Sequence, residues 1–287
     1  MAEFPRTPVG WRVVGRRSSG PFTTEVVWAD PAGGRLAWSS RAHRKHASRL
    51  SRPRPGREHV LWAPHRVSWW IAVLFVAGST CFLVAPLPAF LDVVGARTDA
   101  VVFFVGSLLF TSAAALQWLE TVNADQGPTA AHGGRLRVLS WEPHRIDWWS
   151  SGVQLAGTLF FNATTWRALS TAVDAPSYDQ VVWRPDAFGS VCFLVSGYLA
   201  YVEVAGGWLR RSPRTLEGTL VAVNLAGCVA FGVSAVAAYV VPSTGDLVSV
   251  TVANAATSLG ALGFLVGAVL LLPEGARDAA HASVPAD

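Results

Sequence analysis

The sequence predicts an all-α polytopic integral membrane protein. We expect six transmembrane helices, arranged as three tandem two-helix hairpins, behind a short cytoplasmic N-terminal region that contains a β-hairpin. Two observations predict this class. Of the 287 residues, 51% are hydrophobic and only 15% are charged. The apolar residues also form six runs that are long enough to cross the roughly 30 Å hydrocarbon layer of a bilayer as helices.

The N-terminal region, residues 1–67, precedes the first apolar run. It begins without the apolar stretch of a cleaved signal peptide, so we expect the first span itself to direct insertion. Two alternating runs, at 25–29 and 35–39, flank Asp, Pro and Gly residues that form turns, and this pattern predicts a β-hairpin. An isolated hairpin is only marginally stable in water, so it needs support from the segment WRVV at 11–14 or from the membrane surface.

A basic segment, residues 41–57, follows the predicted hairpin and contains no acidic residue. Each Lys or Arg near an anionic membrane surface contributes about 1 kcal/mol of attraction. We therefore expect this segment to contact anionic lipid headgroups. A nucleic acid would also attract such a run, but the tether to the first span places the segment against the membrane, so no nucleic-acid partner is expected.

The six predicted spans divide the rest of the chain. They cover 68–90, 100–119, 148–168, 187–208, 217–241 and 248–272. They give a first hairpin at 68–119, a cytoplasmic loop at 120–147, a second hairpin at 148–208, a third hairpin at 209–272 and a cytoplasmic tail at 273–287.

The distribution of basic residues predicts the orientation of the spans. The side that holds both termini carries 20 of the Lys and Arg residues, and the other side carries 3. The positive-inside rule therefore places both termini in the cytoplasm. All but one of the basic residues are arginine, a bias typical of a GC-rich bacterial genome. We expect a multi-pass protein of a bacterial plasma membrane.

The chain contains an internal repeat. The motif Trp-x-Pro-His-Arg-x-x-Trp-Trp occurs at 62–70 and 141–149, and a degenerate third copy of its hairpin begins at Pro213. Each copy has an even number of spans, so all copies enter the membrane in one orientation and are related by an axis along the membrane normal. A closed threefold ring and a linear row of hairpins are both compatible with this repeat.

The second helix of each hairpin repeats as well. FFVGSLLF at 103–110 aligns without gaps with FLVSGYLA at 193–200 and FLVGAVLL at 264–271. On this alignment the counterpart of Glu203 in the first hairpin is Ala113, so the repeat does not require a carboxylate at that place.

The Gly-Ser pairs in AGST and VGSLLF lie inside an aromatic-rich apolar hairpin. This hairpin resembles the YrhK-like family of small membrane domains, best over residues 69–118. The resemblance implies a two-span unit and carries over no catalytic residue, because the family is functionally uncharacterised. The basic N-terminal region and the three tandem copies depart from the single unit of that family.

The repeated motif predicts two interfacial anchors just before a span. Proline suits the first turn of a helix, arginine is expected to reach lipid phosphate, and the tryptophans are expected at headgroup level. A sharper alternative is that the two histidines face each other and bind a haem, a metal or an anion, although the third copy has Arg214 at this position. The candidate anchor residues are His65, Arg66, Trp69 and Trp70, and His144, Arg145, Trp148 and Trp149.

Polar side chains inside the predicted spans form the other candidate site. Gln154, Asn224 and Glu203 all fall roughly 8 to 10 Å below the cytoplasmic interface at 1.5 Å per residue. They are expected to form one polar layer of hydrogen bonds between helices. The alternatives are a site for a cation, a proton or a small solute, or a Glu203 that reaches toward Arg210 or Arg211.

No motif of an enzyme or a cofactor site is found: the sequence has no HExxH, P-loop, GxSxG or CxxC. We expect a non-enzymatic protein without a cofactor or metal, which acts through packing, contact with the lipid bilayer, a protein partner or a second copy of itself. The alternative is a small-solute or ion transporter that uses the polar layer.

Overall fold

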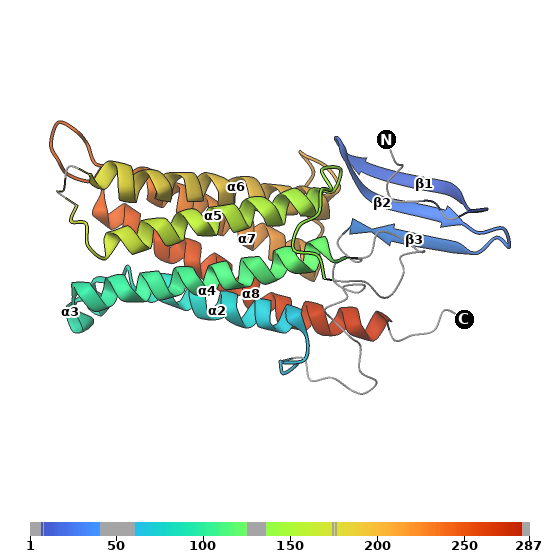
Figure 1. Cartoon of the computed structure of the whole chain (residues 1–287), viewed down its shortest axis with the longest axis horizontal. Helices are drawn as coiled ribbons and strands as arrows, with labels where there is room; N and C mark the ends of the chain where they lie inside the picture. The colour runs from blue at the N-terminus through green and yellow to red at the C-terminus, as the bar shows by residue number, and fades with distance from the viewer. Residues whose placement is uncertain are drawn as a thin grey trace.

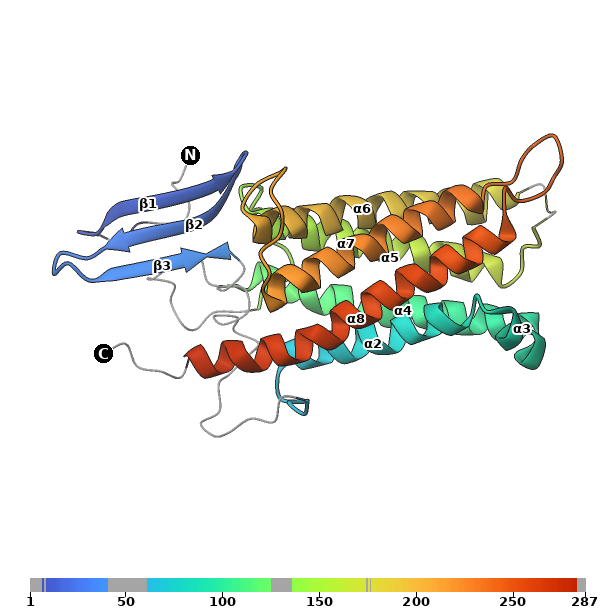
Figure 2. The same ribbon diagram turned by 180° about the vertical axis from the view of Figure 1, so that it is seen from behind.

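A small β-sheet lies at one end of a bundle of long helices in the computed structural model of the chain (Figures 1 and 2). The structure describes residues 7, 9–40, 61–124, 136–173, 175 and 177–282, with side chains up to residue 273. The basic segment at 41–57 lies outside the described residues.

The sheet confirms the predicted hairpin and its support. Strands β1 (Arg12–Ser19), β2 (Phe22–Ala29) and β3 (Arg35–Ser39) are antiparallel in the order β1-β2-β3. The carboxylate Oδ1 of Asp30 accepts a hydrogen bond of 2.8 Å from the N–H of Gly34, which closes the turn between β2 and β3. The segment expected to support the hairpin forms part of β1. Val26, Trp28 and Trp38 form the buried centre of the sheet.

All six predicted spans are helical. The long helices are α2 (Val67–Val84), α4 (Ala96–Val122), α5 (Ile146–Ala168), α6 (Arg184–Ala205), α7 (Leu216–Ala237) and α8 (Val250–Ala282). A single π-helical turn, η1 (Asp179–Trp183), precedes α6, and the short helix α3 (Pro88–Val94) precedes α4.

Two helix ends differ from the predicted spans by more than four residues. The first predicted span, 68–90, is too long, because α2 ends at Val84 before Pro86 and Pro88, and the chain then turns into α3. The last predicted span, 248–272, agrees with the apolar part of α8, which ends at Pro273, but the helix itself continues to Ala282. Much of the predicted tail is therefore the last part of α8.

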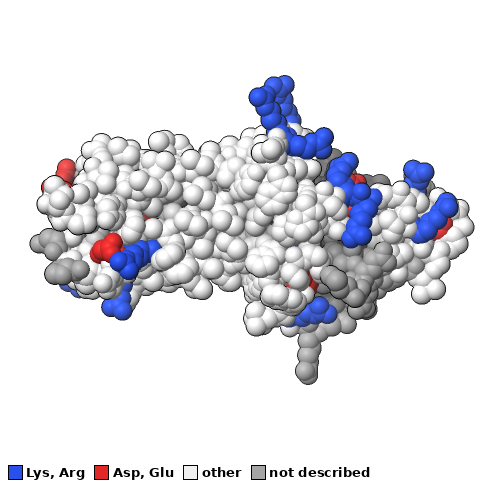
Figure 3. All heavy atoms as spheres, turned by 90° about the horizontal axis from the view of Figure 1, so that it is seen from above, with Lys and Arg blue, Asp and Glu red and all other residues white. Residues whose placement is uncertain are grey.

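Five of the helical segments are long and apolar enough to cross a membrane: α2, α4, η1 with α6, α7, and the part of α8 up to Pro273. Helix α5 is not among them. On the face that Figure 3 shows, charged side chains gather at the end of the bundle away from the sheet and where the bundle meets the sheet, and an uncharged band lies between them. These features are those of an α-helical membrane protein.

The long helices form a closed ring. Each of them packs against the next along the chain, and the last, α8, packs against the first, α2. The hydroxyl of Ser258 in α8 donates a hydrogen bond of 3.1 Å to the carbonyl of Leu83 in α2, across this closure. Of the two arrangements that the sequence allowed, the ring is the one present.

Each long helix crosses its hairpin partner at a Gly-x-x-x-Phe segment. A Cβ atom on Gly189 would lie 2.6 Å from the ring of Phe161, and one on Gly260 would lie 2.6 Å from the ring of Phe231. Only glycine leaves room for this approach. The six segments begin at Gly78, Gly106, Gly157, Gly189, Gly227 and Gly260 and end at Phe82, Phe110, Phe161, Phe193, Phe231 and Phe264.

These crossings correct the predicted alignment of the second helices. Phe110, and not Phe103, makes the contact that Phe193 and Phe264 make in their hairpins. The gap-free alignment of 103–110 with 193–200 and 264–271 was therefore wrong by seven residues, or two helical turns. Leucine and valine recur along these helices, and phenylalanine along α4 and α6, whereas the close approach of the backbones occurs at the Gly-x-x-x-Phe segment of each.

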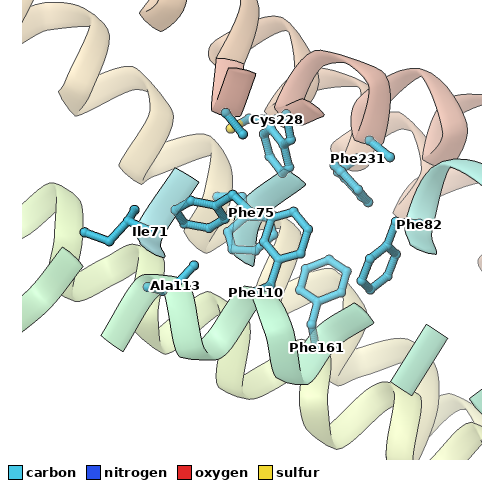
Figure 4. Close-up of a cluster of buried hydrophobic side chains, with 13 residues drawn as sticks. Ile71, Phe75, Phe82, Phe110, Ala113, Phe161, Cys228 and Phe231 are labelled. Atoms are coloured by element: carbon cyan, nitrogen blue, oxygen red, sulfur yellow. The ribbon is translucent and has the colours of Figure 1, made fainter. Parts of the chain in front are cut away.

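The six phenylalanines belong to one buried cluster at the centre of the ring. Figure 4 labels four of them, Phe82, Phe110, Phe161 and Phe231. The rings of Phe82, Phe161 and Phe231 form a triangle with centroid distances of 6.3, 6.2 and 5.9 Å. A second layer lies nearer the sheet, where Phe264 is 5.8 Å from Phe110 and 5.7 Å from Phe193. All six side chains are at most 8% exposed. The axis of the ring is thus closed by aromatic side chains.

Candidate functional site

Two members of the predicted polar layer lie beside the same part of α6. The hydroxyl of Ser196 is 3.5 Å from Oε1 of Gln154 and donates a shorter bond of 2.8 Å to the carbonyl of Ser150. Nδ2 of Asn224 lies 3.7 Å from the place that a Cβ atom on Gly197 would occupy. Gln154 and Asn224 therefore approach α6 from its two neighbours in the ring.

The third member, Glu203, lies at a different level. It is seven residues beyond Ser196 on α6, which is about 10 Å along the helix axis. Its side chain is 8% exposed and accepts a hydrogen bond of 2.5 Å from the hydroxyl of Ser40, just after the sheet. Arg210 and Arg211, the partners considered from the sequence, are exposed. Glu203 therefore belongs to the contact between the sheet and the bundle.

A buried carboxylate at this level also occurs in the first hairpin. Glu203 follows the glycine of its crossing by fourteen residues, and Glu120 follows Gly106 by the same interval. Glu120 is 4% exposed. The predicted counterpart, Ala113, was wrong because the helices had been aligned two turns out of register. Glu274 in α8 follows Gly260 by the same fourteen residues, and its side chain lies outside the described residues.

Aromatic and apolar contacts complete the contact between sheet and bundle. The ring of Phe22 lies 6.4 Å from that of Trp208. A Cβ atom on Gly20 would lie 2.9 Å from Nε1 of Trp208, so the turn between β1 and β2 lies directly against this indole. Phe22 also packs on a small buried cluster of α5 and α6 that contains Ile146 and Val202.

The contact predicts a difference between two substitutions of Glu203. We expect Glu203→Gln to keep the sheet in place, because an amide oxygen still accepts the hydrogen bond from Ser40. Glu203→Val leaves the buried hydroxyl of Ser40 without this acceptor, at a cost of about 1 to 3 kcal/mol. Hydrogen exchange of the sheet amides should be faster in the Val variant alone. Equal exchange in both variants would show that the hydrogen bond does not hold the sheet.

The two copies of the tryptophan motif fold alike. In each copy, the first tryptophan of the Trp-Trp pair donates to the carbonyl eight residues earlier and the second to the carbonyl six residues earlier. The four bonds, all of 2.9 Å, join Trp69 to Leu61, Trp148 to Ser140, Trp70 to Pro64 and Trp149 to Pro143. Trp70 is 45% and Trp149 37% exposed, so the second indole of each pair has the outward position that an interfacial anchor requires.

The arginines of the motif do not have the predicted position. Arg145 is 2% exposed and forms ion pairs with Glu142, at 2.5 Å, and with Asp147. It also donates a hydrogen bond of 3.1 Å to the carbonyl of Thr121. Burial by itself lowers the pKa of Arg145, but Asp147 and then Glu142 raise it above its ordinary value, so the guanidinium stays charged. Arg66 is also buried.

The prediction that these arginines reach lipid phosphate was therefore wrong. In the second copy the cause is the pair of carboxylates, of which Asp147 binds the buried guanidinium through both of its oxygens and Glu142 through one. The first copy has Ala63 and Ser68 at these two positions. The motif is the same in both copies, while the surroundings of its arginine differ.

The histidines of the two motifs lie in different surroundings. His65 is exposed, and His144 is partly buried. Burial lowers the pKa of His144, an effect that the negative charge of Glu142 opposes. In the part of the chain that the structure describes, no group of three His, Cys, Asp or Glu residues could hold a metal ion.

Sequence reasoning missed Asp99 and Asp186. They lie in the first turns of α4 and α6 and line a cavity at the end of the ring away from the sheet. The available signal was an acidic residue within the first turn of an apolar helix.

Comparisons with family models, with curated proteins and with solved structures found no match to this chain. A function must therefore be inferred from the geometry of the chain itself.

Proposed function

We propose that the chain is a six-span, non-enzymatic protein of a bacterial plasma membrane with both termini in the cytoplasm. Its role is that of a membrane-anchored platform, which holds the N-terminal sheet and the basic segment after it at the cytoplasmic surface for contact with anionic lipid and a protein partner. The observation that carries this proposal is the aromatic filling of the ring. Six buried phenylalanines occupy the axis along which a transport path would run.

The sixth span of this proposal is α5. With 23 residues it is about 34 Å long at 1.5 Å per residue. Six of its nine buried residues are polar, which lowers the mean hydropathy of the helix. Its outer face is apolar, because Leu159, Phe160 and Trp166 are 55%, 40% and 57% exposed. A helix with polar residues toward its neighbours and apolar ones outward suits a lipid-facing position in the ring.

The shared crossings support a common origin for the three hairpins. Each hairpin uses the same Gly-x-x-x-Phe contact on both of its helices. The proposal includes the relationship of this unit to YrhK-like domains, three of which are placed in one orientation about an axis along the membrane normal.

The orientation predicts the pattern of labelling from outside the cell. In a variant whose native cysteines are replaced, single cysteines at Asp92 and Thr244 should react with a membrane-impermeant maleimide on intact cells. A cysteine at Arg214 should react only after the cells are opened. The reason is the excess of basic residues on the side of Arg214. Labelling at Arg214 in intact cells would contradict the orientation, and so would protection at both other sites.

A flux measurement distinguishes the platform from the alternative, a transporter that uses Gln154, Asn224 and Glu203. A chain whose axis is closed by phenylalanines should not let ions through. The purified full chain is placed in lipid vesicles, and the flux of protons and of K⁺ is followed with a pH-sensitive dye. We expect the rates of empty vesicles, both for the natural sequence and for Gln154→Leu. A flux that Gln154→Leu abolishes would favour transport through the polar layer.

A further inference from the structure

A cavity of about 290 Å³ lies at the end of the ring away from the sheet. Its volume lies just below the range of about 300 to 1,000 Å³ that is usual for ligand pockets, so a ligand must be small. The phenyl rings of Phe82, Phe161 and Phe231 contribute to its lining. These are the rings of the triangle that closes the axis. The other side chains that matter are two carboxylates, Asp99 and Asp186, and four hydroxyls, Thr164, Thr165, Ser234 and Thr257.

The two carboxylates have no partner in the described part of the chain. Oδ1 of Asp99 is buried and accepts no hydrogen bond from a described residue. Asp186 is partly buried, and the nearby Arg184 pairs with Asp179 instead, at 2.9 Å. Burial, and then the charge of Asp186, raise the pKa of the Tyr178 phenol, so this neighbour stays neutral. Among the described residues, neither Asp99 nor Asp186 forms an ion pair with an arginine.

The hydroxyls of the cavity can only accept hydrogen bonds from a ligand. Each hydroxyl lies 2.8 to 3.0 Å from a main-chain carbonyl, and the hydroxyls of Ser234 and Thr257 also lie 2.7 Å from each other, so the protons are used within the protein. The pairs of hydroxyl and carbonyl are Thr164 and Val182, Thr165 and Phe161, Ser234 and Ala253, and Thr257 and Ala253. No side chain in the lining carries an N–H group. The lining therefore offers acceptors, carboxylates and aromatic rings.

We propose that this cavity binds a small organic cation, a protonated amine with an apolar body. The ammonium group would donate to Asp99, Asp186 and the hydroxyl lone pairs, and the apolar body would contact the phenyl rings, whose faces attract cations. A metal ion fits less well, because Ca²⁺ and Mg²⁺ require about six or more oxygen ligands or waters, and much of this lining is aromatic. The site goes beyond the proposed platform and does not depend on it.

The test is isothermal titration calorimetry of the full chain in detergent with phenethylamine, at a neutral pH at which the amine is protonated. The control ligand is 2-phenylethanol, which has the same apolar body and no charge. We expect saturable binding of the amine alone. Asp99→Asn and Asp186→Asn should each weaken binding by about tenfold or more, since each removes a charge-assisted hydrogen bond. Asp92→Asn is the matched control, because Asp92 is exposed and outside the cavity lining.

A second variant guards against an aspartate substitution that fails to fold. Ala168→Leu adds bulk to the lining while both carboxylates stay, and it should also abolish binding of the amine. The proposal is overturned if 2-phenylethanol binds as tightly as phenethylamine, or if Ala168→Leu binds like the natural sequence. It is also overturned if NaCl or CaCl₂ competes with phenethylamine at equal concentration, which would indicate an inorganic cation site.

Discussion

Replacing Gly260 by alanine should destabilise the ring strongly, although alanine favours a helix. The added Cβ atom would lie 2.6 Å from the ring of Phe231 and 3.0 Å from the carbonyl oxygen of Gly227. The carbonyl belongs to the backbone of α7 and cannot rotate away, so α7 and α8 must separate. Overpacking of this kind costs about 1 to 3 kcal/mol. Thermal unfolding of the detergent-solubilised chain, followed by circular dichroism, measures the loss.

Gly267→Ala is the matched control on the same helix. The nearest atoms to a Cβ atom on Gly267 belong to Asn224, at 3.9 and 4.0 Å, which is ordinary van der Waals contact. Here the helix propensity of alanine, favourable by about 1 kcal/mol over glycine, should leave stability unchanged or higher. Equal unfolding temperatures for the two variants would show that the crossing at Gly260 is not tightly packed.

The helices of the fold were predictable because they lie in a lipid bilayer. A helix in lipid must satisfy its own backbone and expose apolar side chains, so each apolar run in the sequence gave a helix within a few residues. The turn residues around Asp30 likewise predicted the hairpin of β2 and β3. These features depend on local patterns, which a single sequence displays directly.

The register between helices was not predictable in the same way. Phenylalanine recurs along α4, glycine recurs along α8, and both recur along α6, so only the contact itself distinguishes Gly189 from Gly197 in α6. This error led to Ala113 in place of Glu120 as the counterpart of Glu203. The cavity was missed for a related reason, since Asp99 and Asp186 come from different hairpins and meet only when the ring closes.

The burial of Arg145 did have a local signal. Carboxylates occur three residues before it and two residues after it, at Glu142 and Asp147, and only in the second copy of the motif. A lipid-facing arginine does not need two acidic neighbours, whereas a buried one does. The prediction that Arg145 reaches lipid phosphate rested on the usual role of arginine at a membrane interface and did not use this difference between the two copies.

Arg145→Met should therefore cause the largest loss of stability of any single substitution considered for this chain. The guanidinium binds Asp147 through both Nε, at 3.0 Å, and Nη2, and it also binds Glu142 and the carbonyl of Thr121. Asp147 is 0% and Glu142 5% exposed. Without the arginine, two carboxylates remain buried beside each other. Removing one partner of a buried ion pair costs about 3 to 5 kcal/mol.

Two further variants separate the charge from the loss of packing. Arg211→Met, at an exposed arginine, should unfold like the natural sequence. Adding Glu142→Gln and Asp147→Asn to Arg145→Met should restore much of the stability, because the amides carry no charge that must be compensated. Thermal unfolding of all three chains gives the comparison. If the triple variant is no more stable than Arg145→Met alone, the guanidinium acts mainly through packing and its bond to Thr121.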